Sequence, residues 1–164
     1  MNGLLIGRFQ PFHLGHLEAF RFALSKVDKL WIGIGSSNKP SEKKNPFTAD
    51  ERKEMILSSI DNSISERIKI FFIPDLENHE KWIQNIDLIV PDYDIVFTND
   101  ELTQSLYSKC RKKVIPVQFK DREILSGTNI RNKIVSDQDW KSMVPKGTKT
   151  VLEKIGANNR LKIL

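Results

Sequence analysis

The sequence is poor in the residues that build disulfide frameworks and most protein-bound metal centres. Cys110 is the only cysteine among 164 residues, which excludes an internal disulfide and a cysteine-based zinc cluster. The chain has only three histidines, which argues against a histidine-rich zinc site as well. Without a partner cysteine, Cys110 is expected to be a small buried apolar residue. The expected site therefore contains no metal held by protein side chains alone.

Long apolar runs and a secretory leader are missing too. No stretch approaches the roughly 20 apolar residues that cross a bilayer. The Met1–Ile6 segment is too short for the apolar part of a secretory signal and has no basic start. With 39% hydrophobic and 29% charged residues, the composition is that of one globular domain spanning residues 1–164. We expect a cytoplasmic protein with no membrane partner.

Two widespread nucleotide-binding signatures are also absent. The chain has neither the G-x-x-x-x-G-K-[ST] loop of many ATPases nor a G-x-G-x-x-G turn after a strand. The net charge of +5 nevertheless suits a polyanionic partner, either a phosphorylated small molecule or a nucleic acid. The basic residues are not interleaved with a regular series of aromatics, and RNP and KH signatures are absent, so no nucleic acid partner is expected.

Apolar, β-prone segments alternate along the chain with segments of helical period. This alternation is typical of a parallel sheet with helices on its faces. The predicted strands are Gly3–Gly7, Lys29–Gly35, Arg67–Ile73, Asp94–Thr98 and Val114–Gln118. The predicted helices are His16–Lys26, Thr48–Ile60 with a capping box at its start, His79–Val90, Asp100–Lys109, Ser126 to about Ser136, and Val144–Gly156. We expect an α/β, Rossmann-like fold with a parallel sheet of about five strands and helices on both faces.

The stretch Gly7-Arg-Phe-Gln-Pro-Phe-His13-Leu-Gly-His16 follows the first predicted strand and leads into the first helix. In an open parallel sheet, this carboxyl edge is where ligands bind. Free amides and the helix dipole attract phosphate to a helix start, and the guanidinium of Arg8 matches phosphate oxygens. His13 and His16 are three residues apart, so both rings can face the same crevice. These residues together predict a triphosphate-binding site.

A second stretch, Ile124-Leu-Ser126-Gly-Thr128-Asn-Ile-Arg131, also opens a predicted helix. Its hydroxyl groups and the guanidinium that follows them again suit phosphate at a helix start. Taken alone, such a string predicts an ordinary N-cap. Its value as a functional signal comes from its pairing with the first stretch.

The pair G-R-F-Q-P-F-H-L-G-H and L-S-G-T-N-I-R strongly resembles the nucleotidylyltransferase superfamily of HxGH enzymes. Within it, the sequence is most similar to the archaeal-type nicotinamide mononucleotide (NMN) adenylyltransferases, over nearly the whole chain. The resemblance implies transfer of AMP from ATP to NMN, which gives NAD and pyrophosphate by direct in-line attack. It also implies Mg²⁺ bound with ATP, and a homo-oligomer in the form of a hexamer.

The resemblance further implies roles for individual residues. The catalytic residues would be His13, His16 and Arg131, with His16 nearest the reacting α-phosphorus. The ATP-binding residues would be Gly7, Arg8, Phe9, His13, His16, Lys44, Ser126, Thr128 and Arg131. The NMN-binding residues would be Trp82, stacked on the nicotinamide ring, and His79.

Two positions depart from the family pattern. Lys44 stands where related sequences commonly have a loop arginine, and His79 stands where they commonly have an asparagine near the nicotinamide amide. Lysine still offers a point charge and histidine still forms hydrogen bonds, but neither reproduces the replaced geometry. Trp82 also fits an ordinary core position of an amphipathic helix.

Two alternative functions stay open at this point. The same chemistry serves adenylyl or cytidylyl transfer to another phosphorylated acceptor, such as phosphopantetheine or FMN. Trp82 favours a flat aromatic acceptor without separating nicotinamide from other rings. A non-catalytic nucleotide- or RNA-binding module is the alternative from a different class, and the paired motifs argue against it.

Overall fold

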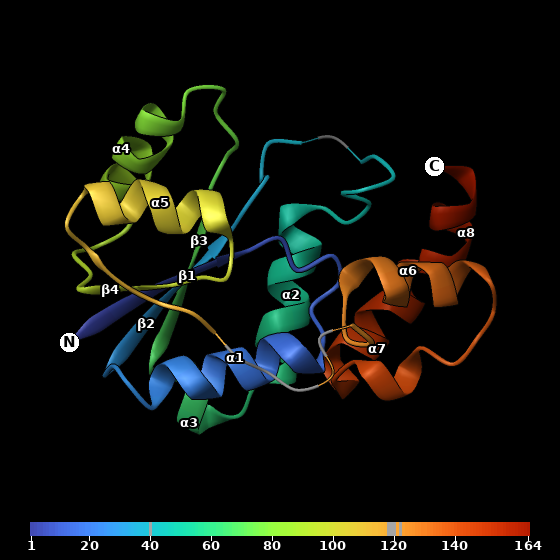
Figure 1. Ribbon diagram of the computed structural model, residues 1–164. Helices are drawn as coiled ribbons and strands as arrows, with labels where there is room; N and C mark the ends of the chain where they lie inside the picture. Colours follow the sequence, from blue (N-terminus) through green and yellow to red (C-terminus); the bar gives the residue numbers. More distant parts are fainter. Residues whose placement is uncertain (40, 118–120, 122) are drawn as a thin grey trace.

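The computed structural model of the protein describes residues 1–39, 41–117, 121 and 123–164 (Figure 1). Its strands are β1 (Asn2–Gly7), β2 (Lys29–Ile34), β3 (Ile68–Phe72), β4 (Ile95–Phe97) and β5 (Lys113–Ile115). Its helices are α1 (Leu14–Leu24), α2 (Ala49–Ser59), α3 (Asn62–Ser65), α4 (His79–Ile89), α5 (Glu101–Lys109), α6 (Gly127–Val135), the 3-10 helix η1 (Lys141–Met143), α7 (Lys146–Lys154) and α8 (Ala157–Ile163). Across the described residues, no helix has the length and apolar character needed to span a membrane.

The five strands form one parallel sheet in the order β3-β2-β1-β4-β5. The chain builds outward from β1 to β3 and then returns across the sheet to β4 and β5, so the strand order reverses between β1 and β4. In a doubly wound sheet, ligands bind outside the carboxyl ends of the strands at such a reversal. The predicted Rossmann-like architecture is confirmed, and it places the first motif directly at this point.

Helices cover both faces of the sheet, and the strand residues alternate between them. Leu4 belongs to a buried cluster under α4 and α5, whereas the next residue, Leu5, belongs to the cluster under α1. Figure 1 shows α4 and α5 on one side of the sheet and α1 and α3 on the other. The second cluster continues into α2, α6, α7 and α8, which pack together beyond the sheet.

The ends of most predicted elements agree with the structure to within about two residues. The capping box before α2 is confirmed: Thr48 Oγ1 accepts a hydrogen bond from the Glu51 amide (3.1 Å), and the Glu51 carboxylate accepts one from the Thr48 amide (2.8 Å). The helix predicted over Val144–Gly156 is present as α7, but the prediction that it is the last helix is wrong. Gly156 adopts a left-handed conformation (φ 65°) that ends α7, and the chain continues as α8. The short helix α3 was not predicted, and the predicted strand end at Gln118 lies outside the described residues.

Cys110 is exposed, so the prediction that it is buried is wrong. The residue directly follows the last turn of α5, and Arg111 beside it adopts a left-handed conformation (φ 58°). This turn carries the chain around the end of the helix toward β5, and position 110 faces solvent as a result.

Candidate active site

Three pockets adjoin along the carboxyl edge of the sheet. The first, of about 320 Å³, is lined by residues at the ends of several strands, including Gly7 and Arg8, and by Trp82. The second, of about 240 Å³, shares Gly7 with the first and reaches His16. The third, of about 210 Å³, shares Trp82 with the first and reaches His79. The first motif and the predicted acceptor residues Trp82 and His79 therefore border one continuous row of pockets at the strand-order reversal.

His13 and His16 form a capping box at the start of α1. The Nδ1 atom of His13 accepts a hydrogen bond from the Gly15 amide (3.0 Å), and the Nδ1 atom of His16 accepts one from the His13 amide (3.1 Å). A nitrogen that accepts carries no hydrogen, so the hydrogen of each neutral ring sits on Nε2. The two rings are stacked with their centroids 3.6 Å apart. Each ring therefore has an Nε2–H donor on its side away from the helix amides.

Burial keeps both imidazoles neutral at physiological pH. His13 is 3% exposed, and burial lowers its pKa to about 4. Burial also lowers the pKa of His16, which retains partial exposure, well below 6.5, and the nearby His13 lowers it further. The rings are therefore hydrogen-bond donors without charge, and the positive charge at this edge comes from arginines.

Phe9 supports His16 from within the core. Its ring packs edge-on against His16, with centroids 4.8 Å apart, and also against Phe12 and Phe20. A Cβ atom on Gly7 would lie 2.8 Å from the Phe9 ring, so the small residue makes room for it. Phe9 is 1% exposed and has a left-handed backbone (φ 53°), which costs roughly 1–3 kcal/mol for a non-glycine residue. The side chain that the resemblance assigns to ATP contact thus lies mainly in the core.

The second motif meets the first at the start of α6. Arg131 donates a hydrogen bond to the carbonyl of Gln10 (2.7 Å), 121 residues away in sequence, and another to Thr128 Oγ1 (3.4 Å). A Cβ atom on Gly127 would lie 2.9 Å from the same Gln10 oxygen, so this close approach requires glycine. Ser126 caps the helix by accepting a hydrogen bond from the amide three residues on (3.1 Å). Both hydroxyls act here as acceptors, so each still has a hydrogen to donate to phosphate.

Three guanidinium groups gather beside this junction. Burial lowers the pKa of Arg131, and the charge of Arg8 lowers it further. Burial and then Arg8 likewise lower the pKa of Arg52, to about 10. Arg52 donates to the Arg8 carbonyl and Arg131 to the Gln10 carbonyl, so both groups lie beside the segment that carries the exposed Arg8. The gathered positive charge suits a polyanionic ligand.

Trp82 and His79 lie on the first turn of α4 and border the other end of the row of pockets. Trp82 is half-buried: its ring packs against the hydrophobic cluster under α4 and α5 and also lines the first and third pockets. His79 is exposed and lines the third pocket. The structure brings these two residues together, and Trp82 both packs on the core and faces the pockets.

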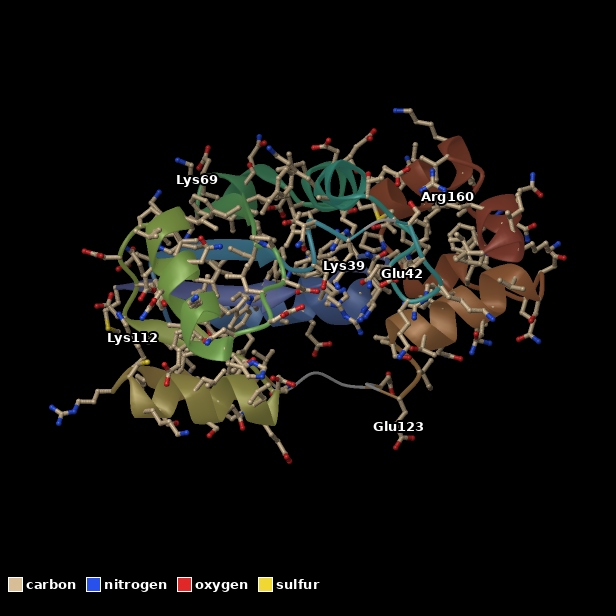
Figure 2. All side chains as sticks on the ribbon, turned by 90° about the horizontal axis from the view of Figure 1, so that it is seen from above. Lys39, Glu42, Lys69, Lys112, Glu123 and Arg160 are labelled. Atoms are coloured by element: carbon tan, nitrogen blue, oxygen red, sulfur yellow. The ribbon has the colours of Figure 1, made fainter. Side chains whose placement is uncertain are left out.

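Lys44 is the predicted site residue that the structure does not bring to the others. It is exposed on the loop between β2 and α2 and lines none of the three pockets. Figure 2 labels Lys39 and Glu42 on the same loop, which lies between the sheet and the C-terminal helices. The loop is therefore near the site, although the Lys44 side chain points to solvent.

Two buried side chains that the motif analysis did not assign tie this loop to the first motif. The side-chain amide of Gln10 donates to the Phe47 carbonyl (3.1 Å) and accepts from the Phe47 amide (3.0 Å). Arg52, which is 1% exposed, donates to the carbonyls of Arg8 (2.8 Å) and Gly35 (2.7 Å). Gln10 lies inside the first motif, and Arg52 directly follows the capping box of α2. Neither position in the sequence indicates that the polar side chain is buried.

The described residues contain no group of three or more histidine, cysteine, aspartate or glutamate side chains that could hold a metal ion. Two carboxylates, those of Asp75 and Asp100, do line the first pocket. Mg²⁺ usually keeps several waters and binds through one or two carboxylates together with substrate phosphates. This donor set fits a metal that arrives with a triphosphate.

Comparisons with known proteins identify the family of the chain. A family model described as cytidylyltransferase-like matches residues 4–133. The chain is 39% identical to the nicotinamide-nucleotide adenylyltransferase of Thermococcus sibiricus, over 100% of this chain and 89% of that protein. It is 36% identical to the protein of the same name from Methanococcus aeolicus, over 100% of this chain and 95% of the other. The Archaeoglobus fulgidus protein of that name is 35% identical, over 99% of this chain and 96% of its own length.

A solved structure shares the fold. The bifunctional NMN adenylyltransferase/ADP ribose pyrophosphatase of Francisella tularensis, complexed with AMP and a manganese ion, matches with a TM-score of 0.75 at 23% identity. The match covers 98% of this chain and 51% of that one, so this chain spans about half of the bifunctional protein. At this identity the likeness supports the fold alone. The full-length sequence matches are what show the family. The chain belongs to the cytidylyltransferase-like family and, within it, to the archaeal-type nicotinamide-nucleotide adenylyltransferases.

Proposed function

We propose that the protein transfers AMP from ATP to NMN and releases NAD and pyrophosphate. The observation that carries the proposal is the hydrogen bond from Arg131 of α6 to the Gln10 carbonyl, in the loop that leads to the paired imidazoles at the start of α1. The same loop borders a pocket that Trp82 also lines. The helix starts supply donors for phosphate, and the indole supplies a surface for a flat acceptor ring. The full-length similarity to archaeal NMN adenylyltransferases supports NMN as that acceptor.

The proposed reaction needs no covalent enzyme intermediate and no strong base. An oxygen of the NMN 5′-phosphate attacks the α-phosphorus of ATP, the new P–O bond forms as the bond to the β-phosphate oxygen breaks, and pyrophosphate leaves. The nucleophile is already an anion, so positioning and charge stabilisation are sufficient. In this proposal the Nε2–H groups of His13 and His16 and the guanidinium groups of Arg8 and Arg131 hold the triphosphate.

We also propose that Mg²⁺ enters with ATP, that the enzyme acts in the cytoplasm, and that it assembles as a homo-oligomer, a hexamer. The two pocket carboxylates fit a divalent ion that is held largely by substrate phosphates, and the Francisella structure contains a manganese ion. The oligomer rests on the family resemblance. Its mass in solution, measured by sedimentation, tests that part separately.

The direct test is to incubate the purified protein with ATP, Mg²⁺ and one candidate acceptor at a time, and to identify the products by mass. NAD and pyrophosphate from NMN support the proposal. A product from phosphopantetheine or FMN, with none from NMN, would keep the chemistry and replace the acceptor. ATP binding without any product would indicate a non-catalytic nucleotide-binding protein.

Replacing His16 by Asn should lower kcat by on the order of 100-fold or more while changing ATP affinity only a few-fold. The Asn side-chain oxygen can still accept from the His13 amide, so α1 should stay capped while the Nε2–H donor is lost. Steady-state kinetics and calorimetry with ATP measure the two effects. Turnover close to that of the wild type would show that this donor does not act on the reacting phosphate.

The pH dependence should reflect neutral imidazoles. Both kcat and kcat/KM should stay level between pH 7.0 and 8.5, whereas a required imidazolium with an ordinary pKa of 6.5 would lose roughly 25-fold over that range. Because burial lowers the pKa of His13 to about 4, the unfolded chain binds more protons than the folded one between pH 6.5 and 4. The melting temperature should therefore fall as the pH drops through that window. A steep loss of activity from pH 7.0 to 8.5 would contradict the neutral-donor role.

Replacing Arg8 by Ala should weaken ATP binding by roughly 10-fold or more, because a charge-assisted contact with phosphate is lost. The melting temperature should stay unchanged or rise by up to about 2 °C, because Arg8 lowers the pKa of both Arg52 and Arg131 and its removal relieves that repulsion. Arg21→Ala removes an exposed arginine from α1 and is the matched control; its ATP affinity should equal that of the wild type. A clear drop in the melting temperature of the Arg8 variant would contradict the repulsion.

Trp82 tests the acceptor side of the site. Trp82→Leu keeps apolar packing but removes the flat ring, so the KM for NMN should rise several-fold, in line with a cation–π contribution of roughly 0.5–2 kcal/mol. The KM for ATP and the melting temperature should change little. Trp82→Ala should show the same KM effect together with a lower melting temperature, because the ring also packs on the core. Equal changes in both KM values of the Leu variant would show that Trp82 acts only by packing on the core.

A further inference from the structure

Arg52 holds together three segments around the first pocket. Its guanidinium donates to the carbonyl of Arg8 in the loop after β1 (2.8 Å), to those of Gly35 (2.7 Å) and Ser36 (3.4 Å) after β2, and to that of Thr48 before α2 (3.2 Å). At 1% exposure it is the largest of the completely buried side chains among the described residues. A buried arginine that bonds four backbone oxygens fixes the relative positions of the segments that carry them.

Three of these carbonyls belong to pocket-lining residues: Arg8, Gly35 and Ser36. The backbone there is strained, because Ser36 (φ 50°) and Phe9 (φ 53°) both adopt left-handed conformations that non-glycine residues rarely take. Arg52 bonds the carbonyl of Ser36 itself and the carbonyl just before Phe9. It therefore keeps both strained loops in place and holds their carbonyl oxygens toward the guanidinium.

The charge of Arg52 is not neutralised by direct contact. Among the described residues, no carboxylate lies within ion-pair distance of it. The charged groups that face it are Arg8, which opposes its protonation, and Asp75 and Glu51, which favour it. Asp75 is exposed, and Glu51 is bonded to Arg160 by two hydrogen bonds (2.6 and 2.9 Å). A charge in such a buried position is screened little by water and acts on a nearby anion.

The C-terminal helix holds the start of α2, the helix that carries Arg52. Arg160 of α8, labelled in Figure 2, binds Glu51 and also donates to the Pro46 carbonyl (3.2 Å). Glu51 in turn accepts from the Thr48 amide. The position of Arg52 is thus fixed both through its own hydrogen bonds and through the helix that bears it.

We propose that Arg52 is a positioning residue for the triphosphate, which holds the loops after β1 and β2 in their binding shapes and contributes a buried positive charge beneath the phosphates. The inference rests on the proposed function, because it takes the first pocket to be a phosphate site. It assigns a role to a residue that contacts no substrate directly.

The test compares ligands that differ in their number of phosphates. Calorimetry with ATP, AMP and adenosine should show ATP affinity reduced on the order of 10-fold or more in Arg52→Gln, AMP affinity reduced less, and adenosine affinity within about 2-fold of the wild type. Lys53→Gln removes the same charge from the next position of α2, where Lys53 lies over the exposed Phe72 ring (5.7 Å), and should leave all three affinities unchanged. Equal losses for ATP and adenosine in the Arg52 variant would overturn the proposal and leave a purely structural residue.

A conservative variant decides the matter if Arg52→Gln does not fold. Arg52→Lys keeps the charge in the same surroundings of Arg8, Asp75 and Glu51, but a buried lysine has a lowered pKa and loses its proton more readily than arginine. Its ratio of ATP to adenosine affinity should be near the wild-type value at pH 7.5 and fall several-fold by pH 9. A ratio that does not change with pH overturns the role of the charge.

These experiments measure ligand binding and require no turnover. They remain interpretable if NMN is not the acceptor, because ATP, AMP and adenosine test the phosphate site alone. Failure of the wild type to form NAD, with the phosphate-dependent pattern intact, would contradict the proposed acceptor and not the role of Arg52.

Discussion

The amide hydrogens at the start of α1 need acceptors, and the side chains that supply them are the imidazoles of His13 and His16. Using Nδ1 for this purpose leaves the hydrogen of each neutral ring on Nε2. The same two hydrogen bonds therefore complete the helix start, select the tautomer and orient the remaining donors. Burial removes the charge from both rings, and the edge-on packing of Phe9 fixes the His16 ring. The geometry of the rest of the site depends on this junction between strand and helix.

The positive charge of the site lowers the stability of the folded chain. Arg8, Arg52 and Arg131 lie close enough for Arg8 to lower the pKa of the other two, and burial adds to that effect. Such an arrangement is unfavourable without a ligand and becomes favourable when a polyanion arrives. The left-handed backbone of Phe9 and Ser36 adds strain in the same loops. Backbone strain and charge repulsion are concentrated where the triphosphate is proposed to bind. Functional sites commonly lower the stability of the folded chain in this way.

The two proposed substrates meet because of the sheet topology. The carboxyl ends of β1 and β4 are neighbours although β2 and β3 lie between them in sequence, and the helices that follow diverge from that point. The first pocket consequently has Gly7 at one side, toward the histidines, and Trp82 at the other. The pocket thus joins the segment that carries the first motif to the predicted acceptor side chain.

The sequence by itself determined the order of the elements, the capping box before α2 and the two motifs at the starts of α1 and α6, because each depends on residues within a few positions of one another. The tertiary structure alone decided that Arg131 reaches Gln10, 121 residues away, that Arg52 is buried, and that Lys44 and Cys110 face solvent. The burial of a polar side chain depends on whether the fold brings acceptors to it from distant segments. Four carbonyls from two loops do so for Arg52, and no local pattern of residues encodes that meeting.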